Sequence, residues 1–487
     1  MNQQVDLLYS AEQVRELDRI AIEERGISGL TLMKRAAEAC VLTLLEHWPA
    51  PGPIAVLCGS GNNAADGFII AGLLAARGFD VRLCLIGREP QHPSDAAEAY
   101  EFALANGITA VSLEEALNGA GVIVDALLGT GASGEVRPHF KQAIQAANRT
   151  SLPILSVDLP SGLSADTGAQ AGECIHASLT VTFIGRKLGL YTGDGPECAG
   201  DIYFADLDVP ADVFRAVAAS ANCLDYGTEA GNLRRRHRNS HKGDNGHVLI
   251  VGGDTGMTGA AVMAAEAALF AGAGLVSVAT RDPIAIVTRR PEIMARQVED
   301  AGELRKLMTR ASVVVLGPGL GIDDWGRALL AEALTGSLPL VVDADGLNLI
   351  AEMPLSRDDW ILTPHPGEAA RLLGEKAIQM NRPAAVRALI DKFGGTVLLK
   401  GAGTLIGSRD EMSLCPYGNP GMSVAGMGDV LSGVIAALVA QGLAPLQAAR
   451  LGAVVHSLAA DYLVDRQGER GLLATELLPE IRRLVNL

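Results

Sequence analysis

Short apolar runs alternate with helical patterns along most of the chain. In the first half the apolar runs predict β-strands, and the spacing of apolar residues predicts helices over 11–24, 67–77 and 94–106. The predicted strands of this half are residues 54–58, 81–86, 121–127, 154–157 and 178–183. This alternation is typical of a parallel sheet covered by helices on both faces.

The second half starts the same pattern again after an interruption. Residues 209–241 hold an Ala-rich helix, then turn-forming residues, then a basic stretch. The strands predicted after it are residues 247–251, 275–279, 312–316, 340–342, 360–362 and 396–399. The sequence therefore predicts two α/β domains, residues 1–220 and 221–487.

Charge and composition narrow the class of partner. The 487 residues carry 40 Lys and Arg against 56 Asp and Glu, a formal net charge of −16. This sign argues against nucleic acid and anionic membranes, and 4% aromatic residues leave few rings for stacking on single strands. The basic segment 234–242 is the local exception. It is either a solvated entry to the second domain or a cover for a phosphate-rich ligand.

No segment of the sequence has the pattern of a membrane span or a secretory signal. The longest apolar run, 430–440, is well short of the roughly 20 residues that a span needs, and the first residues are charged and amphipathic. Seven cysteines without a CxxC pair favour small core residues over disulfides or zinc. We expect a cytoplasmic protein, and an Ala-rich apolar surface is consistent with a homo-oligomer.

Glycine-rich loops follow predicted strands of the first half. Residues 59–67 (GSGNNAADG) join a strand to a helix, and the free N–H groups of a helix start can hold an anion. Asp66 in this loop is either a helix cap or a ligand contact. Residues 129–134 form G-x-G-x-x-G, which together with Asp158 suggests dinucleotide binding. Two observations argue against an ordinary dinucleotide-binding motif. The pattern follows a later strand of the domain and not the first one, and Asp158 leads directly into a tight turn.

Several polar residues lie at or just after the ends of these predicted strands. The carboxyl ends of parallel strands meet at one edge of a sheet, so the segments could converge on one cleft. The oxygens of Asn63, Asp125 and Ser161 are hard ligands, suited to a cation that prefers oxygen. The alternative, that each residue only forms a turn or a cap, fits the segments singly but less well together.

The second half contains a helix start suited to phosphoryl chemistry. Within residues 423–442, Gly426 and Gly428 permit close approach of an anion, and the following helix directs its positive end toward it. Asp429 either caps this helix or acts as a base that accepts a proton from a hydroxyl.

Two further positions of the second half admit a structural and a functional interpretation. Lys400 and the glycines after it either hold a nucleotide phosphate or form a hairpin turn at the surface, and no Walker P-loop is present. His365 lies between two prolines after a predicted strand. It either contacts a ligand or is structural.

Together these segments resemble the bifunctional NAD(P)H-hydrate repair enzymes, in which an epimerase is fused to an ADP-dependent dehydratase. The resemblance covers nearly the whole chain and keeps the order of the motifs. The epimerase half is represented by YSAEQVRELD, GSGNN–DG, DALLGTG, SVDLPSGL and TFIGRKLGL. The dehydratase half is represented by SHKGDNGHVLIVGGD, GPGLG, DADGLN, TPHPGEAARLLG, KGAGT and AGMGDVLSG. The most specific of these are TPHPGE and GMGDVLSG.

The resemblance implies a Rossmann-like three-layer first domain and a ribokinase-like α/β second domain. It implies that the first domain interconverts the R and S hydrates of NADH and NADPH. The second would dehydrate the S form at the expense of ADP, giving AMP and phosphate. Asp158 would transfer a proton during epimerisation, and Asp429 would activate the hydroxyl of the hydrate toward the β-phosphate of ADP.

Binding residues are implied by the same resemblance. Potassium in the first domain would be held by Asn63, Asp125 and Ser161, and magnesium would act in the second. The hydrate would be contacted by Asn62, Asn63, Ala64, Ala65, Asp66, Gly129, Thr130, Gly131, Ala132, Ser133, Gly134, Glu135, Asp158, Ala260, Gly319, His365 and Asp429. The adenine nucleotide would be contacted by Lys400, Gly401, Ala402, Gly403, Thr404 and Gly428. The family has a glycine pair at Ala64 and Ala65, where a positive φ would strain alanine by roughly 1–2 kcal/mol.

Three other functions are consistent with the same residues. One is a ribokinase-like small-molecule kinase with an accessory dinucleotide-binding domain. The second is a dehydrogenase, which would oxidise NADH with a carbonyl compound. The third is a nucleotide-sensing scaffold that binds ADP and NADH without turnover. Recovery of the reduced nicotinamide absorbance from hydrated NADH with ADP separates these functions from repair.

Overall fold

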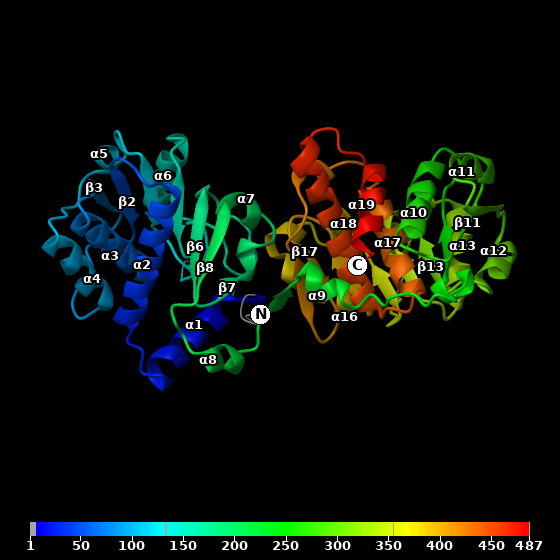
Figure 1. The fold of residues 1–487 in the computed structure, drawn as a ribbon, viewed down its shortest axis with the longest axis horizontal. Helices are drawn as coiled ribbons and strands as arrows, with labels where there is room; N and C mark the ends of the chain where they lie inside the picture. The colour runs from blue at the N-terminus through cyan, green and yellow to red at the C-terminus, as the bar shows by residue number, and fades with distance from the viewer. Residues whose placement is uncertain (1–5, 132–133, 354, 487) are drawn as a thin grey trace. The chain divides into compact units, whose positions relative to one another are not determined.

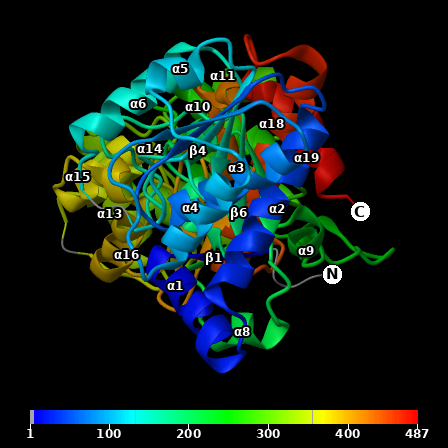
Figure 2. The ribbon, with the colours of Figure 1, turned by 90° about the vertical axis from the view of Figure 1, so that its left-hand side faces the viewer.

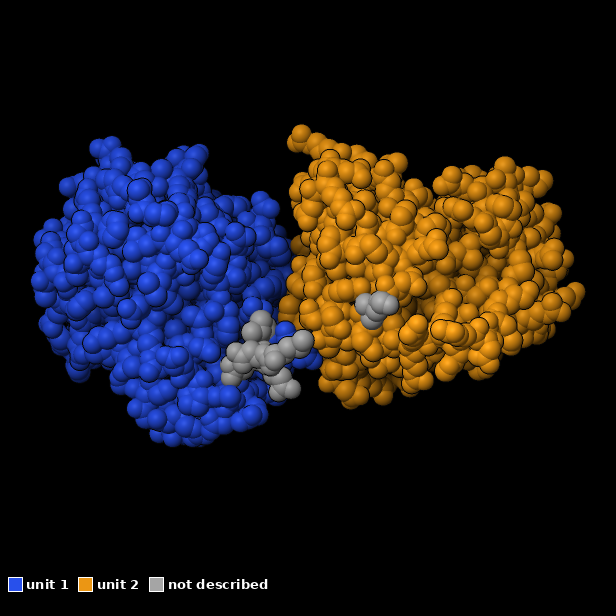
Figure 3. Space-filling view, in the orientation of Figure 1, with its two compact units in different colours: residues 1–222 blue, residues 223–487 orange. Residues whose placement is uncertain are grey.

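The computed structural model describes residues 6–131, 134–353 and 355–486. The chain forms two compact units, residues 1–222 and 223–487 (Figure 3). Each unit has a sheet and a hydrophobic core of its own. Within the described residues, no helix combines the length and the apolar character needed to cross a membrane.

A parallel sheet forms the centre of the first unit. Its strand order is β3-β2-β4-β5-β6-β8, and all neighbouring strands are parallel. The strands are β2 (Ile54–Cys58), β3 (Val81–Leu85), β4 (Val122–Ala126), β5 (Ile154–Val157), β6 (Leu179–Phe183) and β8 (Asp201–Ala205). The chain passes from β2 to β3 and then returns to β4 on the other side of β2. Ligands of open α/β sheets bind at the carboxyl ends of strands beside such a reversal.

Helices cover both faces of this sheet, because alternate residues of its buried strands enter two different hydrophobic clusters. Val56 of β2 belongs to a cluster with α2, α3 and α4, whereas Leu57 belongs to a cluster with α5 and α6 (Figures 1 and 2). The helices are α1 (Ala11–Arg19), α2 (Gly29–His47), α3 (Asn62–Ala76), α4 (Asp95–Ala105), α5 (Leu113–Leu117), α6 (Pro138–Arg149), α7 (Gly195–Ala199) and α8 (Ala211–Ala216). The first unit is therefore a three-layer α/β fold, as predicted.

Some elements of the first unit differ from the sequence prediction. The helix predicted from residue 67 begins at Asn62, because Gly61 is its N-cap residue and the two asparagines already have helical backbone. The helix predicted over 11–24 consists of α1 followed by a π-helical turn, Ile20–Glu24. The short strands β1 (Leu7–Tyr9), β7 (Arg186–Lys187) and β9 (Ala221–Cys223) were not predicted, and β1 pairs with both others.

The second unit is built around a mixed sheet. Its strands follow one another in the order β12-β11-β10-β13-β14-β15-β16-β17-β18, parallel as far as β16 and antiparallel beyond it. They are β10 (His247–Val251), β11 (Leu275–Thr280), β12 (Met294–Gln297), β13 (Val313–Leu316), β14 (Leu340–Val342), β15 (Trp360–Leu362), β16 (Thr396–Leu399), β17 (Thr404–Gly407) and β18 (Met412–Cys415). The order reverses between β10 and β13. The strands β12, β17 and β18 were not predicted.

Helices pack on this second sheet through a core rich in alanine, valine and leucine. The helices α10 and α17 pack against each other, and α17 lies on β10, β13 and β14 (Figure 1). The helices are α9 (Tyr226–Ala230), α10 (Thr258–Phe270), α11 (Pro283–Arg289), α12 (Ala301–Met308), α13 (Asp324–Thr335), α14 (Ala344–Ile350), α15 (Pro366–Leu373), α16 (Arg382–Phe393), α17 (Met427–Ala440), α18 (Pro445–Gln467) and α19 (Leu477–Leu484). The start of α17 is thereby fixed near the carboxyl ends of the central strands.

Candidate active sites

In the first unit, Asp125 forms the centre of a buried hydrogen-bond network beside the reversal point of the sheet. It lies near the end of β4 and is fully buried. Its carboxylate accepts hydrogen bonds from the Ser161 hydroxyl (2.6 Å), the Ser161 backbone N–H (2.9 Å) and the Ser156 hydroxyl (2.9 Å). Burial raises the pKa of Asp125 above its ordinary value, while these hydrogen bonds act in the opposite direction. A bound cation would stabilise the charged form of this carboxylate.

Asn63 joins the same network from the first turn of α3. Its side-chain N–H donates to the Leu128 carbonyl (3.0 Å), and the Ser161 hydroxyl lies 3.2 Å from that carbonyl oxygen. A Cβ on Gly129 would lie 3.1 Å from the Cβ of Asn63, so glycine permits this close approach. The structure thus brings together the residues that the sequence predicts as cation ligands. Carboxylate, amide, hydroxyl and carbonyl oxygens fit a hard cation such as K⁺.

Asp158 follows β5, has an unusual backbone conformation and pairs with a buried lysine. Its φ of 67° lies in the left-handed region, which costs roughly 1–3 kcal/mol for a residue other than glycine. Lys187 of β7 forms an ion pair with its carboxylate and is 1% exposed. The Phe183 backbone N–H donates to the same oxygen (3.3 Å). Lys187 was not predicted as a site residue from the sequence, although the motif TFIGRKLGL contains it.

Two further carboxyls, Asp66 of α3 and Asp18 of α1, interact electrostatically with Asp158. Asp66 does not cap α3, because Gly61 is the N-cap residue. Its Oδ1 is buried and has no hydrogen-bond partner among the described residues. Burial, followed by the charges of Asp158 and Asp18, raises the pKa of Asp66 well above its ordinary value. Burial also raises the pKa of Asp18 to about 6, and this residue of the YSAEQVRELD motif was not assigned from the sequence.

The other predicted hydrate contacts of the first unit lie around this edge of the sheet. Asn62, Ala64 and Ala65 belong to the first turns of α3, and neither alanine has a positive φ, so the strain considered for this pair does not arise. Residues 129–131 and 134–135 lie between β4 and α6 and are partly or fully exposed, while Ala132 and Ser133 lie outside the described residues. The G-x-G-x-x-G pattern does not open a helix, because α6 begins only at Pro138.

In the second unit, the start of α17 carries the carboxyl that the sequence indicates as a base. Gly426 is the N-cap residue, with a φ of 94° and no side-chain cap, so Asp429 does not cap this helix. Burial, followed by the charge of Asp343, raises the pKa of Asp429 to about 7. A carboxyl with this pKa can accept and return a proton near neutral pH. A Cβ on Gly428 would lie 3.1 Å from the Lys400 ammonium, so glycine leaves the approach to that charge open.

Lys400 belongs to a buried charge network, and its interpretation as a surface residue is wrong. Its ammonium lies 2.7 Å from Asp343 Oδ1 and 3.8 Å from Glu368 Oε2, and the Ser432 hydroxyl donates to Asp343 Oδ2 (2.8 Å). Burial alone would raise the pKa of Asp343, but the Lys400 charge and these hydrogen bonds hold it below its ordinary value. Asp343, Glu368 and Ser432 were not assigned from the sequence, although DADGLN, TPHPGE and GMGDVLSG contain them.

Residues 401–404 form the turn between the antiparallel strands β16 and β17. Gly401 has a φ of 134° and Gly403 a φ of 59°, so the turn needs glycine there. The fully buried Arg382 donates to the carbonyls of Lys400 (3.3 Å) and Gly403 (3.3 Å). Arg382, which was not assigned from the sequence, thereby fixes the turn, and Thr404 closes it by donating to the Gly401 carbonyl (3.0 Å).

His365 is the N-cap residue of α15. Its ring Nδ1 accepts a hydrogen bond from the Gly367 N–H (2.9 Å), and its own backbone N–H donates to Glu368 (2.7 Å). Burial, followed by the charges of Lys400 and Arg371, lowers the pKa of His365. About half of the side chain is exposed (51%), so the ring can cap the helix and still contact a ligand.

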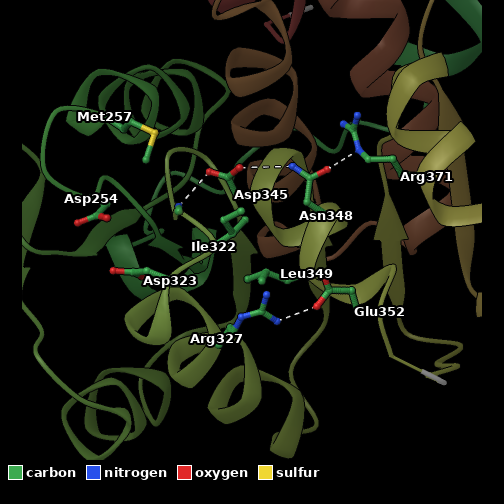
Figure 4. A pocket seen from close by; sticks show the side chains of 11 residues that line it. Asp254, Met257, Ile322, Asp323, Arg327, Asp345, Asn348, Leu349, Glu352 and Arg371 are labelled. Atoms are coloured by element: carbon green, nitrogen blue, oxygen red, sulfur yellow. Dashed lines mark hydrogen bonds and ion pairs between the residues drawn. The ribbon is translucent and has the colours of Figure 1, made fainter.

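A cavity of about 690 Å³ adjoins this network (Figure 4). One of its walls is Asp345, whose charge contributes to the raised pKa of Asp429. Gly319 and Ala260 adjoin another wall, because a Cβ on Gly319 would lie 2.9 Å from that of Met257, and the Ala260 N–H donates to the Met257 carbonyl (3.2 Å). The cavity is lined by Asp254, Met257, Gly321, Ile322, Asp323, Arg327, Asp345, Asn348, Leu349, Glu352 and Arg371.

The lining of this cavity combines apolar and polar groups. Met257 and Ile322 are large apolar side chains with 40% and 58% exposure. Arg371 donates to Asn348 (2.9 Å), and Arg327 donates to Glu352 (2.8 Å) (Figure 4). Exposed apolar side chains beside carboxylate and amide oxygens suit a ligand that has both rings and hydroxyl groups, as a nucleoside does.

The basic segment 234–242 is largely exposed. Arg236 donates hydrogen bonds to the Gly272 carbonyl and to Gln441 (2.9 Å), which lie after α10 and α17. These contacts favour the interpretation as an entry segment of the second unit.

Two α/β units, each with buried carboxyl and lysine side chains at the carboxyl ends of its parallel strands, define an enzyme with two active sites. Comparison with known proteins also indicates an enzyme with two domains of different activity. The family model for NAD(P)H-hydrate dehydratase matches residues 248–483, and that for the YjeF-related protein N-terminus matches residues 29–189. The chain belongs to the family of bifunctional NAD(P)H-hydrate repair enzymes.

Relatives of this name match along their whole length. The bifunctional NAD(P)H-hydrate repair enzyme of Coxiella burnetii is 48% identical over 99% of this chain and 99% of its own. That of Escherichia coli is 41% identical over 98% of this chain and 94% of its own. The structure of the ADP/ATP-dependent NAD(P)H-hydrate dehydratase of Bacillus subtilis is 26% identical and covers 54% of this chain and 98% of its own, with a TM-score of 0.50. The second unit therefore has the predicted ribokinase-like fold.

Proposed function

We propose that this chain repairs hydrated NADH and NADPH at two separate sites. The first unit interconverts the R and S hydrates, and the second dehydrates the S hydrate at the expense of ADP, giving AMP and phosphate. The observation that carries the proposal is that one chain holds two carboxyl centres, Asp158 with Lys187 and Asp429 with Lys400, each at the edge of a sheet of its own. Family membership over the full length supports it.

In the second unit, Asp429 acts as the base of a phosphoryl transfer. It takes the proton from the hydroxyl of the hydrate, and the hydroxyl oxygen attacks the β-phosphorus of ADP while the bond to AMP breaks. The C–O bond then breaks, so that inorganic phosphate leaves, and loss of a proton from the neighbouring ring carbon restores the double bond of the ring. Lys400 and the backbone N–H groups at Gly428 stabilise the charge on the transferred phosphate.

The two ligands of the second unit bind at different places: the nucleotide at the turn between β16 and β17, and the hydrate toward the cavity. Lys400, Gly401, Ala402, Gly403, Thr404 and Gly428 hold the adenine nucleotide. Ala260, Gly319, His365 and Asp429 contact the hydrate, whose remaining part extends into the cavity of about 690 Å³. Magnesium would supply positive charge that stabilises the phosphates. Within the described residues, no group of three His, Cys, Asp or Glu side chains is arranged to hold a metal ion, so this ion would arrive with the phosphates of the nucleotide.

In the first unit, Asp158 transfers a proton while the R and S hydrates interconvert. Asn63, Asp125 and Ser161 would hold K⁺, which would supply positive charge near the bound hydrate. The hydrate is contacted by Asn62–Asp66, residues 129–135 and Asp158. The orphaned oxygen of Asp66 and the exposed β4–α6 connection support this placement. Location in the cytoplasm, homo-oligomer formation and the lack of nucleic-acid partners stay predictions of the sequence.

The test is recovery of the reduced nicotinamide absorbance from hydrated NADH. The protein is incubated with a mixture of both epimers and ADP. We expect recovery of the whole mixture with ADP and none when the nucleotide is omitted. A small-molecule kinase would consume ATP with another acceptor and leave the hydrate unchanged, so no recovery with either nucleotide would overturn the proposal.

A further inference from the structure

Four ionisable side chains from separate elements form one shielded cluster in the first unit. They are Asp18 of α1, Asp66 of α3, Asp158 after β5 and Lys187 of β7. The Lys187 ammonium contacts Asp158 directly, and Asp66 interacts with the charges of Asp158, Asp18 and Lys187. The cluster thus contains three carboxyl groups and one ammonium. Since several negative charges in a shielded site repel one another, such a cluster retains a proton.

The hydrogen bonds of Lys187 show which carboxyl group its ammonium contacts. An ammonium group has three N–H donors. Those of Lys187 reach Asp158, the Thr182 hydroxyl (3.1 Å) and the Phe183 carbonyl (3.0 Å). No donor of Lys187 is left for Asp66, whose Oδ1 is buried without a partner among the described residues.

The other titratable groups that face Asp66 carry no compensating positive charge. Cys40 of α2 and Cys58 of β2 both interact electrostatically with Asp66. Both thiols are fully buried, and burial raises the pKa of each well above its ordinary value, so both are neutral. The ionised form of Asp66 would therefore be stabilised only by the distant charge of Lys187, which already serves Asp158.

We propose that Asp66, whose buried oxygen lacks a partner among the described residues, is the acid of the epimerisation, and that Asp158, paired with Lys187, is its base. Lys187 is the positioning residue that holds the Asp158 carboxylate in place. The inference deepens the proposed function and rests on the epimerase activity of the first unit.

The reaction balances without an outside reagent. The Asp66 carboxyl gives its proton to the hydroxyl of the hydrate, the C–O bond breaks, and water leaves while the ring nitrogen lone pair forms a C=N bond. Water then adds to the opposite face of this iminium carbon. Its proton passes to the Asp158 carboxylate as the new C–O bond forms and the electron pair returns to nitrogen. The reverse epimerisation runs through the same groups with the roles exchanged.

Asp66→Asn tests the acid directly. Asparagine has nearly the same shape and is neutral, as the protonated carboxyl is, so the variant should fold with an unchanged melting temperature. It cannot deliver the proton, and epimerisation should fall by roughly 10²–10⁴-fold while ADP-dependent dehydration of the S hydrate is unchanged. The matched control is Asp212→Asn, an exposed carboxylate of the same unit that pairs with Arg25. Epimerisation within a few-fold of wild type in Asp66→Asn would overturn the inference.

The pH profile of epimerisation distinguishes proton transfer from a structural role. Activity should fall at high pH, where Asp66 loses its proton, and Asp18→Asn should move this limb to lower pH because a neighbouring negative charge is removed. Lys187→Met should slow epimerisation, because the Asp158 carboxylate loses the ammonium that holds it in place, and Lys187→Arg should largely restore the rate. An unmoved profile in Asp18→Asn, or wild-type epimerisation in Lys187→Met, would contradict the assignment.

A spectroscopic measurement keeps the inference testable without turnover. At neutral pH the infrared band of protonated carboxylic acids should be weaker in Asp66→Asn than in the wild type, while the contribution of Asp429 to this band remains. A band that persists unchanged in this variant would overturn the assignment of the proton to Asp66. If the wild type itself shows no epimerisation, the proposed function of the unit fails. If the wild type is active and Asp66→Asn is equally active, only this inference fails.

Discussion

The two proposed catalytic aspartates have different relations to the nearest lysine. In the first unit, Lys187 forms an ion pair with Asp158 itself. In the second unit, Lys400 lies 2.7 Å from Asp343, and Asp429 keeps a pKa of about 7. A carboxylate paired with a cation holds its charge, whereas a buried carboxyl among other carboxylates retains a proton until near neutral pH.

The difference follows from the chemistry proposed for each site. A direct ion pair with Lys400 would make Asp429 a weak base. Asp429 would then also neutralise the ammonium that a phosphate group needs. With Asp343 as the partner, Lys400 stays positioned for phosphate and Asp429 stays basic enough to take a proton from a hydroxyl. In the first unit no phosphoryl group is transferred, so Lys187 can form an ion pair with Asp158 directly.

The strongest way to separate the two sites is Asp429→Asn. Asparagine cannot accept the proton of the hydroxyl, so ADP-dependent dehydration should fall by roughly 10²–10⁴-fold while epimerisation is unchanged. Dehydration is followed by nicotinamide absorbance and epimerisation by chromatographic separation of the hydrates. Asp324→Asn, an exposed carboxylate of the same unit, is the matched control. Equal loss of both activities would contradict separate sites.

Removing the partner of Lys400 should affect both stability and activity of the second unit. Asp343→Asn leaves a mostly buried ammonium without its closest carboxylate, which should cost about 3 kcal/mol of unfolding free energy. Dehydration should also weaken, because Lys400 is no longer fixed for phosphate. Denaturant unfolding gives the first quantity and the KM for ADP the second. Unfolding and KM values like those of wild type would show that the pair does not position Lys400.

The pH dependence of dehydration should reflect the raised pKa of Asp429. The base works in its deprotonated form, so kcat/KM should be constant above pH 7 and should fall about tenfold per pH unit below it. Epimerisation should not share this limb, because Asp429 lies in the other unit and takes no part in it. A dehydration profile that stays flat down to pH 5 would contradict the role of Asp429 as a base.

The smallest expected effect concerns the alanine pair of α3. Ala65→Gly should destabilise the first unit by about 1 kcal/mol, because glycine lowers helix propensity at a position where the backbone is helical. Epimerisation should be unchanged, as neither alanine has a positive φ. Thermal unfolding and the epimerisation rate measure the two effects. Faster epimerisation in the glycine variant would show that the alanine pair impairs the loop.

The sequence predicted local features better than it predicted contacts. Most strands of both sheets followed from their apolar runs, although β8 and β12 did not, and Asp125 and Ser161 could be paired because they lie at or just after the ends of strands that meet at one edge. Lys187 could not be placed by such reasoning, because β7 is two residues long and pairs with β1 near the start of the chain. The start of α3 was placed too late, because asparagines at 62 and 63 have low helix propensity but follow the N-cap glycine.

The roles of ambiguous side chains depended on burial, which the sequence does not contain. Lys400 could be a surface residue until its contacts with Asp343 and Glu368 were known. Asp429 could be a helix cap until Gly426 proved to be the N-cap residue. The first case was decided by groups that are distant in the chain, and the second by the backbone of a residue three positions away.

Mixing two variants tests the claim of two independent sites most directly. Asp158→Ala alone should recover only the S hydrate, and Asp429→Asn alone should recover none. An equimolar mixture of the two proteins with ADP should recover both hydrates completely, because the epimer formed on one chain can diffuse to the other. Recovery by the mixture that stops at the level of Asp158→Ala alone would contradict the account.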